Sequence, residues 1–400
     1  MFFRYLLGAI LLYWKKQYPD IMFYRYPWVR RLGRLQVKIL HTGDVHLGMA
    51  FSRYPEAVRK GLAQARLRAL EKMVTEANRQ SCQLMVIAGD LFHSSSPEVK
   101  LRRQAFDILS SFTGKVLAVL PGNHDYNDGL AELWPSMERE RFERMLILNE
   151  QRVYPLDKYG LEVDLYPAPC HGRRLPDHRL DWINGITPNP ERLAIGIAHG
   201  AVEGLSPDLQ GAYFYMTIPE LEAIPVDIWL LAHSHTRYPD QEKAENSRLL
   251  MCGTPEPDGA GDSRYGNAWI VSLDKNGNQV EAFDPSTYRF YDLTNEITCE
   301  EDLIALERNL LASNPQYSLV KLKLTGKLER DVYTSGQKLY DQWREMLYYL
   351  ELEDDLQIEL ASREIDQEFT ADSFPHRLLS HLVDDPLALQ LAYKLIGRAR

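Results

Sequence analysis

The chain contains few cysteines and no long apolar run. Its 400 residues include four cysteines, and none forms a C-x-x-C pair. This scarcity excludes a disulfide framework and a zinc finger, and it favours a reducing compartment, so we expect a cytoplasmic protein. No apolar stretch reaches the length of a transmembrane helix, and two lysines follow the short run Tyr5–Trp14 without a small-residue cleavage site. We therefore expect neither stable membrane insertion nor a signal peptide.

An excess of basic charge is also missing. The 46 Lys and Arg residues are outnumbered by 56 Asp and Glu residues, which gives a formal net charge of −10. The whole-protein basic footprint of many nucleic-acid-binding proteins is therefore absent, although bound divalent metals can supply local positive charge to a nuclease. No ATP-binding motif occurs, and the Gly- and Pro-rich stretch 253–266 lacks a P-loop signature. Any ATPase would be a separate polypeptide.

The length and composition are those of a globular protein with one large domain and a smaller one. Hydrophobic residues make up 45% of the chain and charged residues 26%. Residues 1–36 differ, because they are basic and aromatic and contain a single acid, Asp20. They have the composition of an interfacial membrane anchor or a nucleic-acid arm. We favour a third interpretation, a peripheral extension with Met22 as an internal alternative start.

Five short apolar runs predict buried strands, and each ends in Asp, Asn or His. They are Val37–His46, Leu84–Asp90, Val116–Asp125, Leu193–His199 and Asp227–His235. Buried strands commonly end in turn residues, but a repeated ending in metal-ligand residue types is hard to explain by packing. Open α/β sheets bind their ligands at the carboxyl ends of the strands. The five runs therefore predict one site at a common edge.

Strands and helices alternate at the start of this region. Helices are expected over 55–80 and 98–111, between the first three strands, which predicts parallel pairing with right-handed crossovers. In the first helix we expect Arg66 on the solvent side, opposite apolar residues such as Leu62. Further along, the runs 268–273 and 279–283 flank Asp-Lys-Asn-Gly-Asn, which indicates a hairpin.

The last hundred residues show no strand that ends in Asp or His. We expect helices over 300–313, 331–351 and most of 371–400, and strands over 318–325 and 356–361. These segments predict a small α+β domain that contributes no metal ligand.

The strand-end residues share a chemistry. They are Asp44, His46, Asp90, Asn123, His124, His199, His233 and His235. Carboxylate and amide oxygens mixed with imidazoles suit Mn²⁺, Fe²⁺ or Zn²⁺ better than Ca²⁺. The set is too large for one ion, whereas two ions that share one carboxylate account for it. Such a pair of ions catalyses in-line phosphoryl displacement by water.

This pattern resembles the calcineurin-like metallophosphoesterases. The matching pieces occur in the family's order over residues 37–236: Asp44-Val-His46, Gly89-Asp90, Gly122-Asn123-His124-Asp125, His199 and His233-Ser-His235. The resemblance implies an α/β fold with four layers, a β-sandwich flanked by helices, and a small C-terminal α+β capping domain. We expect an extension over 1–36, a nuclease domain over 37–290, and a capping or partner-binding domain over 295–400.

The resemblance also implies a role for each matching residue. Asp44, His46 and His235 would bind one metal, Asn123, His199 and His233 the other, and Asp90 would bridge the two. His124 would act on the reacting phosphate, and Asp125 would orient His124 through its other ring nitrogen. The implied cofactors are two divalent ions per chain, Mn²⁺ first, with Fe²⁺, Zn²⁺ or Mg²⁺ as alternatives. Ala232 departs from the family's usual glycine, and a left-handed backbone there would be strained.

Two segments are most similar to the SbcD- and YhaO-type DNA repair exonuclease subunits: Ile39–Gly48 and Gly89–His93. This similarity implies DNA as substrate and an SbcC-type coiled-coil ATPase as partner. We therefore expect a two-metal-ion phosphodiesterase that hydrolyses DNA as an exonuclease subunit. The alternatives are a small-molecule phosphodiesterase or phosphatase on the same fold, and a metal-bound scaffold without activity. Cleavage polarity, strand preference, the native metal and homodimer formation are left open by the sequence.

Overall fold

The computed structural model describes residues 35–174, 180–206, 214–259, 265–358 and 362–399. The described chain forms two compact units, the first ending at Thr287 and the main part of the second beginning at Tyr288. The predicted extension over residues 1–36 lies outside the described residues except for its last two positions. The assignment of nuclease and capping roles to the two parts stays a prediction.

The first unit contains a seven-stranded sheet with the order β12-β15-β14-β1-β2-β3-β4. Its strands are β1 (Gln36–Thr42), β2 (Leu84–Ile87), β3 (Val116–Val119), β4 (Met145–Ile147), β12 (Lys243–Glu245), β14 (Ala268–Asp274) and β15 (Gly277–Phe283). The strands β1 to β4 pair in parallel, as the alternation of strands and helices predicts. The predicted hairpin is confirmed, because β14 pairs antiparallel with β15.

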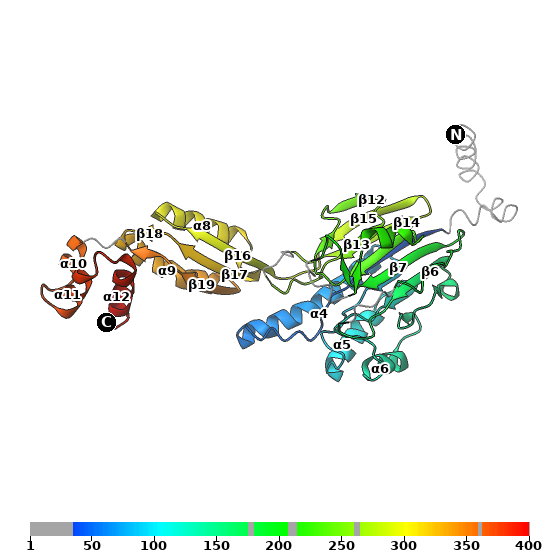
Figure 1. Cartoon of the computed structure of the whole chain (residues 1–400). Helices are drawn as coiled ribbons and strands as arrows, with labels where there is room; N and C mark the ends of the chain where they lie inside the picture. The colour runs from blue at the N-terminus through cyan, green and yellow to red at the C-terminus, as the bar shows by residue number, and fades with distance from the viewer. Residues whose placement is uncertain (1–34, 175–179, 207–213, 260–264, 359–361, 400) are drawn as a thin grey trace, which may run out of the picture. The chain divides into compact units, whose positions relative to one another are not determined.

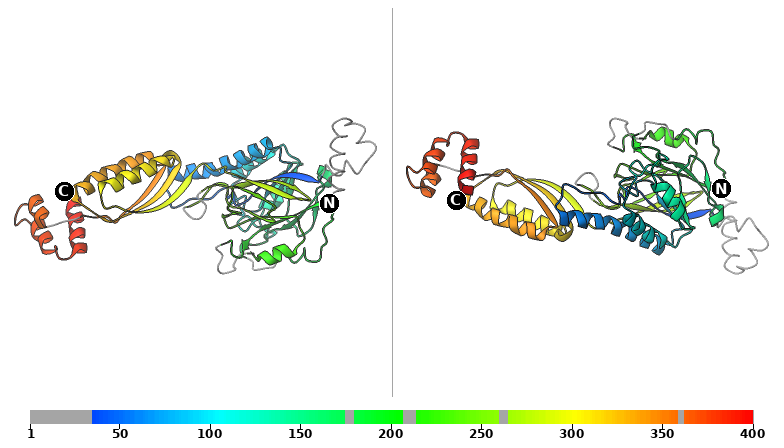
Figure 2. Two further views of the ribbon diagram at one scale, coloured as in Figure 1. Left: turned by 90° about the horizontal axis from the view of Figure 1, so that it is seen from above. Right: turned by 90° about the horizontal axis from the view of Figure 1, so that it is seen from below.

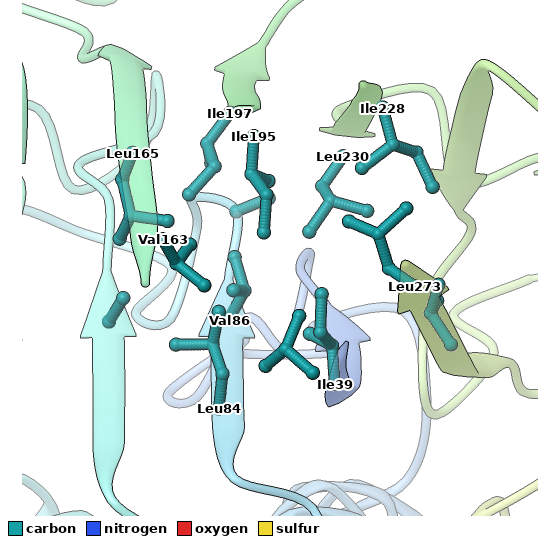
Figure 3. Packing of buried hydrophobic residues seen from close by; sticks show 14 of the residues in the cluster. Ile39, Leu84, Val86, Val163, Leu165, Ile195, Ile197, Ile228, Leu230 and Leu273 are labelled. Carbon is teal, nitrogen blue, oxygen red and sulfur yellow. The ribbon is translucent and has the colours of Figure 1, made fainter. Parts of the chain in front are cut away.

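A second sheet of six strands packs against the first, with the order β11-β13-β10-β7-β6-β5. It comprises β5 (Tyr154–Pro155), β6 (Val163–Ala168), β7 (Leu193–His199), β10 (Ile228–Ala232), β11 (Arg237–Tyr238) and β13 (Leu249–Cys252). Figure 3 shows the core between the sheets, where Ile39 and Val86 of the first face Ile195 and Leu230 of the second. All four side chains are buried, so this layer fixes the two sheets face to face.

Helices cover the outer face of the first sheet (Figure 1). They are α4 (Glu56–Arg79), α5 (Val99–Ser110) and α6 (Leu133–Glu140). The expectation that Arg66 faces solvent is wrong, because Arg66 lies four residues from both Leu62 and Leu70 on the buried face of α4. Its guanidinium Nη1 donates a hydrogen bond of 2.8 Å to the Val45 carbonyl. This hydrogen bond to a backbone oxygen offsets part of the cost of burying the arginine.

The outer face of the second sheet carries little regular structure. It is covered by the short helix α7 (Ile218–Ala223) and by irregular segments that pack on Trp229 and Met251. The small elements of this unit are η1 (Asp157–Tyr159), β8 (Ala201–Val202) and β9 (Tyr215–Met216). Helices, two sheets and this outer cover make up the expected α/β fold with four layers.

The second unit has a three-stranded parallel sheet, β16-β17-β19, with α8 and α9 along one face (Figure 2). Its elements are β16 (Arg289–Glu296), α8 (Glu300–Ala312), η2 (Pro315–Tyr317), β17 (Ser318–Thr325), β18 (Lys327–Leu328), α9 (Arg330–Met346), β19 (Tyr349–Asp354), β20 (Gln357–Ile358), α10 (Ser362–Glu368), α11 (Phe374–His381) and α12 (Pro386–Ala399). The helix predicted over 331–351 is too long, because α9 ends at Met346 and β19 follows it. Strand β16 has no counterpart among the predicted strands. Among the described residues, no helix is long and apolar enough to cross a bilayer.

Candidate metal centre

The predicted ligands gather at one edge of the sandwich because their strands run the same way. Strands β1, β2 and β3 are parallel within the first sheet, and β7 and β10 are parallel within the second. Each strand delivers its ligands in its last residue or in the connection that follows it. The topology therefore brings together residues that are as far apart in sequence as Asp44 and His235.

Asp44, His46 and His235 form the first ligand group. The Nε2 atoms of His46 and His235 are 3.0 Å apart. Asp44 Oδ1 lies 3.7 Å from the first of these nitrogens and 3.6 Å from the second. Three potential ligand atoms from three residues therefore face one point, as expected for the first metal.

Asn123, His199 and His233 form the second group. The amide oxygen Oδ1 of Asn123 is 2.8 Å from Nε2 of His199 and 3.1 Å from Nδ1 of His233. His199 also contacts the Ala88 carbonyl through Nδ1 at 2.9 Å. That contact assigns one ring proton to Nδ1, so Nε2 is the nitrogen that would bind a metal after it loses its own proton.

Asp90 lies between the two groups. Its Oδ2 is 3.6 Å from Nε2 of His46 and 3.4 Å from Nε2 of His199. The other oxygen, Oδ1, accepts the backbone N–H of His124 at 2.8 Å. One carboxylate oxygen thus faces both groups, which is the placement that a bridging ligand needs.

One buried atom tests whether these residues fit a cation. Asp44 is fully buried, and Oδ1 has no hydrogen-bond donor among the residues that the structure describes. Its other oxygen, Oδ2, accepts the backbone N–H of His233 at 2.7 Å. An unpaired buried carboxylate oxygen is costly unless a cation compensates it. The side chains therefore fit divalent metals, with Asp44 Oδ1 aimed at the first.

The electrostatics of the metal-free centre depend on burial and on charge pairing. Burial raises the pKa of Asp44 against the opposing charges of His235 and His199. Burial also acts to raise the pKa of Asp90, but the neighbouring His199 and His46 outweigh it and hold that pKa below its usual range. Burial acts to lower the pKa of His199, whereas Asp90 and Asp44 act more strongly and raise it to about 9. In the metal-free protein, a proton on His199 therefore supplies positive charge at the place where a metal ion would bind.

The backbone at the ligands is strained. Asp44, His46, Asp90, His233 and His235 have positive φ angles of 50°, 48°, 54°, 125° and 56°. Such angles are uncommon for residues other than glycine and tend to occur at functional sites. The strain predicted at Ala232 is not found there, because Ala232 ends β10 and the positive φ falls on the next residue. Backbone hydrogen bonds hold the first two ligands, from Asp44 N to Gly89 O and from His46 N to Asp90 O.

Two glycines allow the connections to approach one another closely. A Cβ atom on Gly122 would lie 2.1 Å from Oδ1 of Asp90. A Cβ atom on Gly89 would lie 2.3 Å from Nδ1 of His199. Both distances are shorter than any real contact, so the G-N-H-D and G-D motifs need glycine for space beside the ligands.

His124 lies beside the ligands, close to the first group. Its ring centroid is 4.8 Å from that of His46 and 4.7 Å from that of His93, on which it stacks. Its Nδ1 is 3.3 Å from the His93 carbonyl, a contact that assigns the ring proton to Nδ1. His93 Nδ1 is also 3.3 Å from His46 Nδ1. The sequence analysis used His93 only as a mark of similarity to the exonuclease subunits. Its position three residues after Asp90 could also have predicted that it lies in the site.

The expected contact between Asp125 and the His124 ring is wrong. Asp125 is fully buried, and its two carboxylate oxygens accept the backbone N–H groups of Phe92 and Gly122 at 3.0 and 2.7 Å. Burial and the charge of Asp90 raise the pKa of Asp125 to about 7, against these two hydrogen bonds. The carboxylate therefore joins the connections after β2 and β3, and the His93 carbonyl is the partner of the His124 ring.

Comparisons with known proteins find relatives that share part of this sequence. A 270-residue stretch is 26% identical to the DNA double-strand break repair protein Mre11 of Methanopyrus kandleri and covers 60% of this chain and 55% of that protein. A 207-residue stretch is 25% identical to the uncharacterized metallophosphoesterase YhaO of Bacillus subtilis and covers 50% of this chain and 48% of that one. The chain thus spans about half the length of these two relatives. Over 97 residues it is 32% identical to the SbcD component of the SbcCD nuclease of Staphylococcus saprophyticus, 24% of each chain.

A family model matches half of the chain, and a solved structure shows a weak likeness to it. The structure of TT1561 of Thermus thermophilus aligns with a TM-score of 0.36 at 14% identity and covers 62% of this chain and 99% of that one. The family model described as calcineurin-like phosphoesterase matches residues 37–237. That range contains every predicted ligand, from Asp44 to His235. The chain belongs to the calcineurin-like phosphoesterase family.

Proposed function

We propose that this protein is a two-metal-ion phosphodiesterase that hydrolyses DNA with Mn²⁺, in the cytoplasm, as an exonuclease subunit. The observation that carries the proposal is the position of Asp90 Oδ2, 3.6 Å from His46 Nε2 and 3.4 Å from His199 Nε2. One carboxylate between two ligand groups is the arrangement of a dimetal site that acts on phosphate esters. The names of the relatives, a double-strand break repair protein and a component of a nuclease, support DNA as the substrate.

The residues divide the work of hydrolysis. When bound, two divalent cations would neutralise charge on the phosphoryl oxygens and lower the pKa of the attacking water. The two ligand groups would hold those cations, and Asp90 would be the carboxylate that contacts both. His124 directs its Nδ1–H to the His93 carbonyl, and in the doubly protonated ring Nε2 carries the second proton, which it gives to the leaving oxygen to become neutral. Asp125 keeps the loop of His124 against that of Asp90 through its two backbone hydrogen bonds.

The test compares two substrates with one preparation. Wild-type protein with Mn²⁺ is expected to shorten end-labelled linear DNA and to hydrolyse bis(p-nitrophenyl) phosphate. Asp90→Asn, which keeps the size of the side chain, is expected to lose both activities. Rapid turnover of a nucleotide or cyclic nucleotide without DNA cleavage would replace the proposal with a small-molecule phosphodiesterase. Bound metal without hydrolysis of any of these substrates would indicate a scaffold.

The C-terminal helices supply a surface for the ATPase partner that we propose, an SbcC-type coiled-coil subunit. On α12, Leu391 and Leu395 lie four residues apart on one face and are 62% and 57% exposed. Phe374 at the start of α11 is 75% exposed. Exposed apolar side chains of this kind suit a coiled-coil partner. Replacing both leucines with Asp is expected to abolish co-purification with a co-expressed SbcC-type subunit, and unchanged co-purification would contradict this surface.

A further inference from the structure

A short basic segment, His171–Arg174, follows strand β6 with the sequence His-Gly-Arg-Arg. Its three basic side chains are exposed, in a chain whose formal net charge is −10. The sequence pattern assigns it no role, and it contains none of the predicted ligands. Its position relative to the metal centre is therefore informative.

Hydrogen bonds tie this segment to the loop that carries Asn123 and His124. The backbone N–H of Cys170 donates to the Pro121 carbonyl at 3.0 Å, just before that loop. The backbone N–H of Asn127 donates to the Cys170 carbonyl at 2.9 Å, just after it. His171 extends the contact, because its Nδ1 is 2.9 Å from the Asn127 carbonyl. The start of the basic segment is thus hydrogen-bonded to both ends of the loop that carries His124.

Arg173 brings a positive charge to the segment that is hydrogen-bonded to the His124 loop. Arg173 lies three residues after Cys170, whose backbone groups are hydrogen-bonded to Pro121 and Asn127 on either side of His124. It is exposed, and no salt bridge engages it within the part of the chain that the structure describes. A solvent-accessible guanidinium on a segment fixed to the His124 loop can bind an anion.

We propose that Arg173, with His171 beside it, binds the phosphate next to the scissile one and so selects a polynucleotide over a small phosphoester. This inference rests on the proposed DNA hydrolase function. A guanidinium matches a phosphate group with two parallel hydrogen bonds, and the contact carries no base preference. A small diester has no second phosphate, so it gains little from this contact. Arg173 is accordingly a specificity-determining residue, and His124 remains the group that touches the reacting phosphate.

The experiment compares Arg173→Gln with Arg79→Gln. Arg79 ends helix α4 near the start of the strands, at the edge opposite the metal centre, and its removal changes the net charge by the same amount. Binding of a fluorescent single-stranded oligonucleotide and of a blunt duplex is measured by anisotropy at several salt concentrations, with EDTA present to prevent cleavage. Hydrolysis of linear DNA and of bis(p-nitrophenyl) phosphate is then measured with Mn²⁺.

We expect Arg173→Gln to reduce the slope of log Kd against log salt by about 0.7 for the single strand and about 0.9 for the duplex, the loss of one phosphate contact. The ratio of kcat/KM for DNA to kcat/KM for the small diester is expected to fall roughly tenfold, because the variant loses one charged hydrogen-bonded contact to DNA. Arg79→Gln should behave as wild type. A wild-type slope in Arg173→Gln, or equal losses on both substrates, would overturn the inference while the proposed function stands. Wild-type protein that neither binds nor cleaves DNA would overturn both.

Discussion

Gly122→Ala tests how closely the metal centre depends on contact between two connections. The added Cβ would lie 2.1 Å from Oδ1 of Asp90 and 2.4 Å from its backbone nitrogen. An ordinary contact begins near 3.4 Å, so the two groups must separate by about 1.3 Å. Asp90 is 1% exposed, and its Oδ1 already accepts the backbone N–H of His124. The carboxylate therefore has little room to move, and a shift would take Oδ2 away from both ligand groups.

The expected magnitudes follow from that displacement. Metal ligands must stay within about 0.2 Å of their ideal distances, so a shift of about 1 Å at the bridging carboxylate should reduce the metal content well below two ions per chain. A displacement of this size typically reduces kcat about 10²-fold, and overpacking costs about 1–3 kcal/mol of folding free energy. The assay combines elemental analysis after dialysis, kcat on bis(p-nitrophenyl) phosphate, and thermal unfolding.

Gly129→Ala is the matched control, since a Cβ there would meet no atom within 4 Å. Its φ of 76° costs alanine about 1–2 kcal/mol, a penalty that Gly122→Ala does not carry, so the control shows the effect of a destabilised loop without a clash at Asp90. Gly122→Ala protein that keeps two metals and near wild-type kcat would refute the close approach on which this reasoning depends.

Three further predictions concern the ligands and the acid. Asp90→Asn should lose both metals, because Asp90 Oδ2 faces both ligand groups. Asp44→Asn should lose mainly one metal, because Asp44 Oδ1 faces the first group. If elemental analysis finds two metals per chain in Asp90→Asn, the carboxylate does not bridge the two sites. His124→Asn should keep the fold, metals and DNA binding but lower kcat about 10²–10⁴-fold, and near-normal turnover or metal loss would show that its role is misassigned. His199 has a pKa raised to about 9 in the metal-free protein, so it is protonated below that pH and must release the proton to bind metal. As the pH is raised toward 9, metal affinity should therefore increase about tenfold per pH unit. Calorimetry in two buffers of different ionisation enthalpy measures the proton that is released. Metal binding without proton release at pH 7 would contradict this assignment.

The gathering of these side chains at one edge could be predicted because they share a chemical signal, a metal-ligand residue type after each apolar run, that packing does not produce. Asp44, Asp90 and His199 each follow an apolar run, and parallel strands bring such ends to one edge. The same local signal says nothing about which side-chain atoms face one another. The partners of Asp125 are backbone N–H groups of Phe92 and Gly122, and backbone donors leave no trace in a residue pattern.

The remaining errors share a physical cause, which is that tertiary contacts decided the outcome. The charge of Arg66 favours solvent, but its spacing from Leu62 places it on the buried face, where the Val45 carbonyl satisfies it. The segment after Met346 alternates leucine with glutamate, and it pairs with β17 as a strand instead of extending α9. Parallel pairing with a distant segment cannot be read from local propensity.

The left-handed backbone at the ligands determines which substitutions isolate chemistry from folding. Glycine and asparagine adopt positive φ at little cost, whereas alanine loses about 1–2 kcal/mol per position. Alanine scanning across Asp44, His46, Asp90 and His235 would therefore mix conformational penalties with the loss of ligand atoms. Asparagine replacements preserve the torsional preference and remove only the charge or the imidazole. In a mutational library, Asn and Gly should be the most frequent survivors at these positions when selection acts on abundance instead of activity.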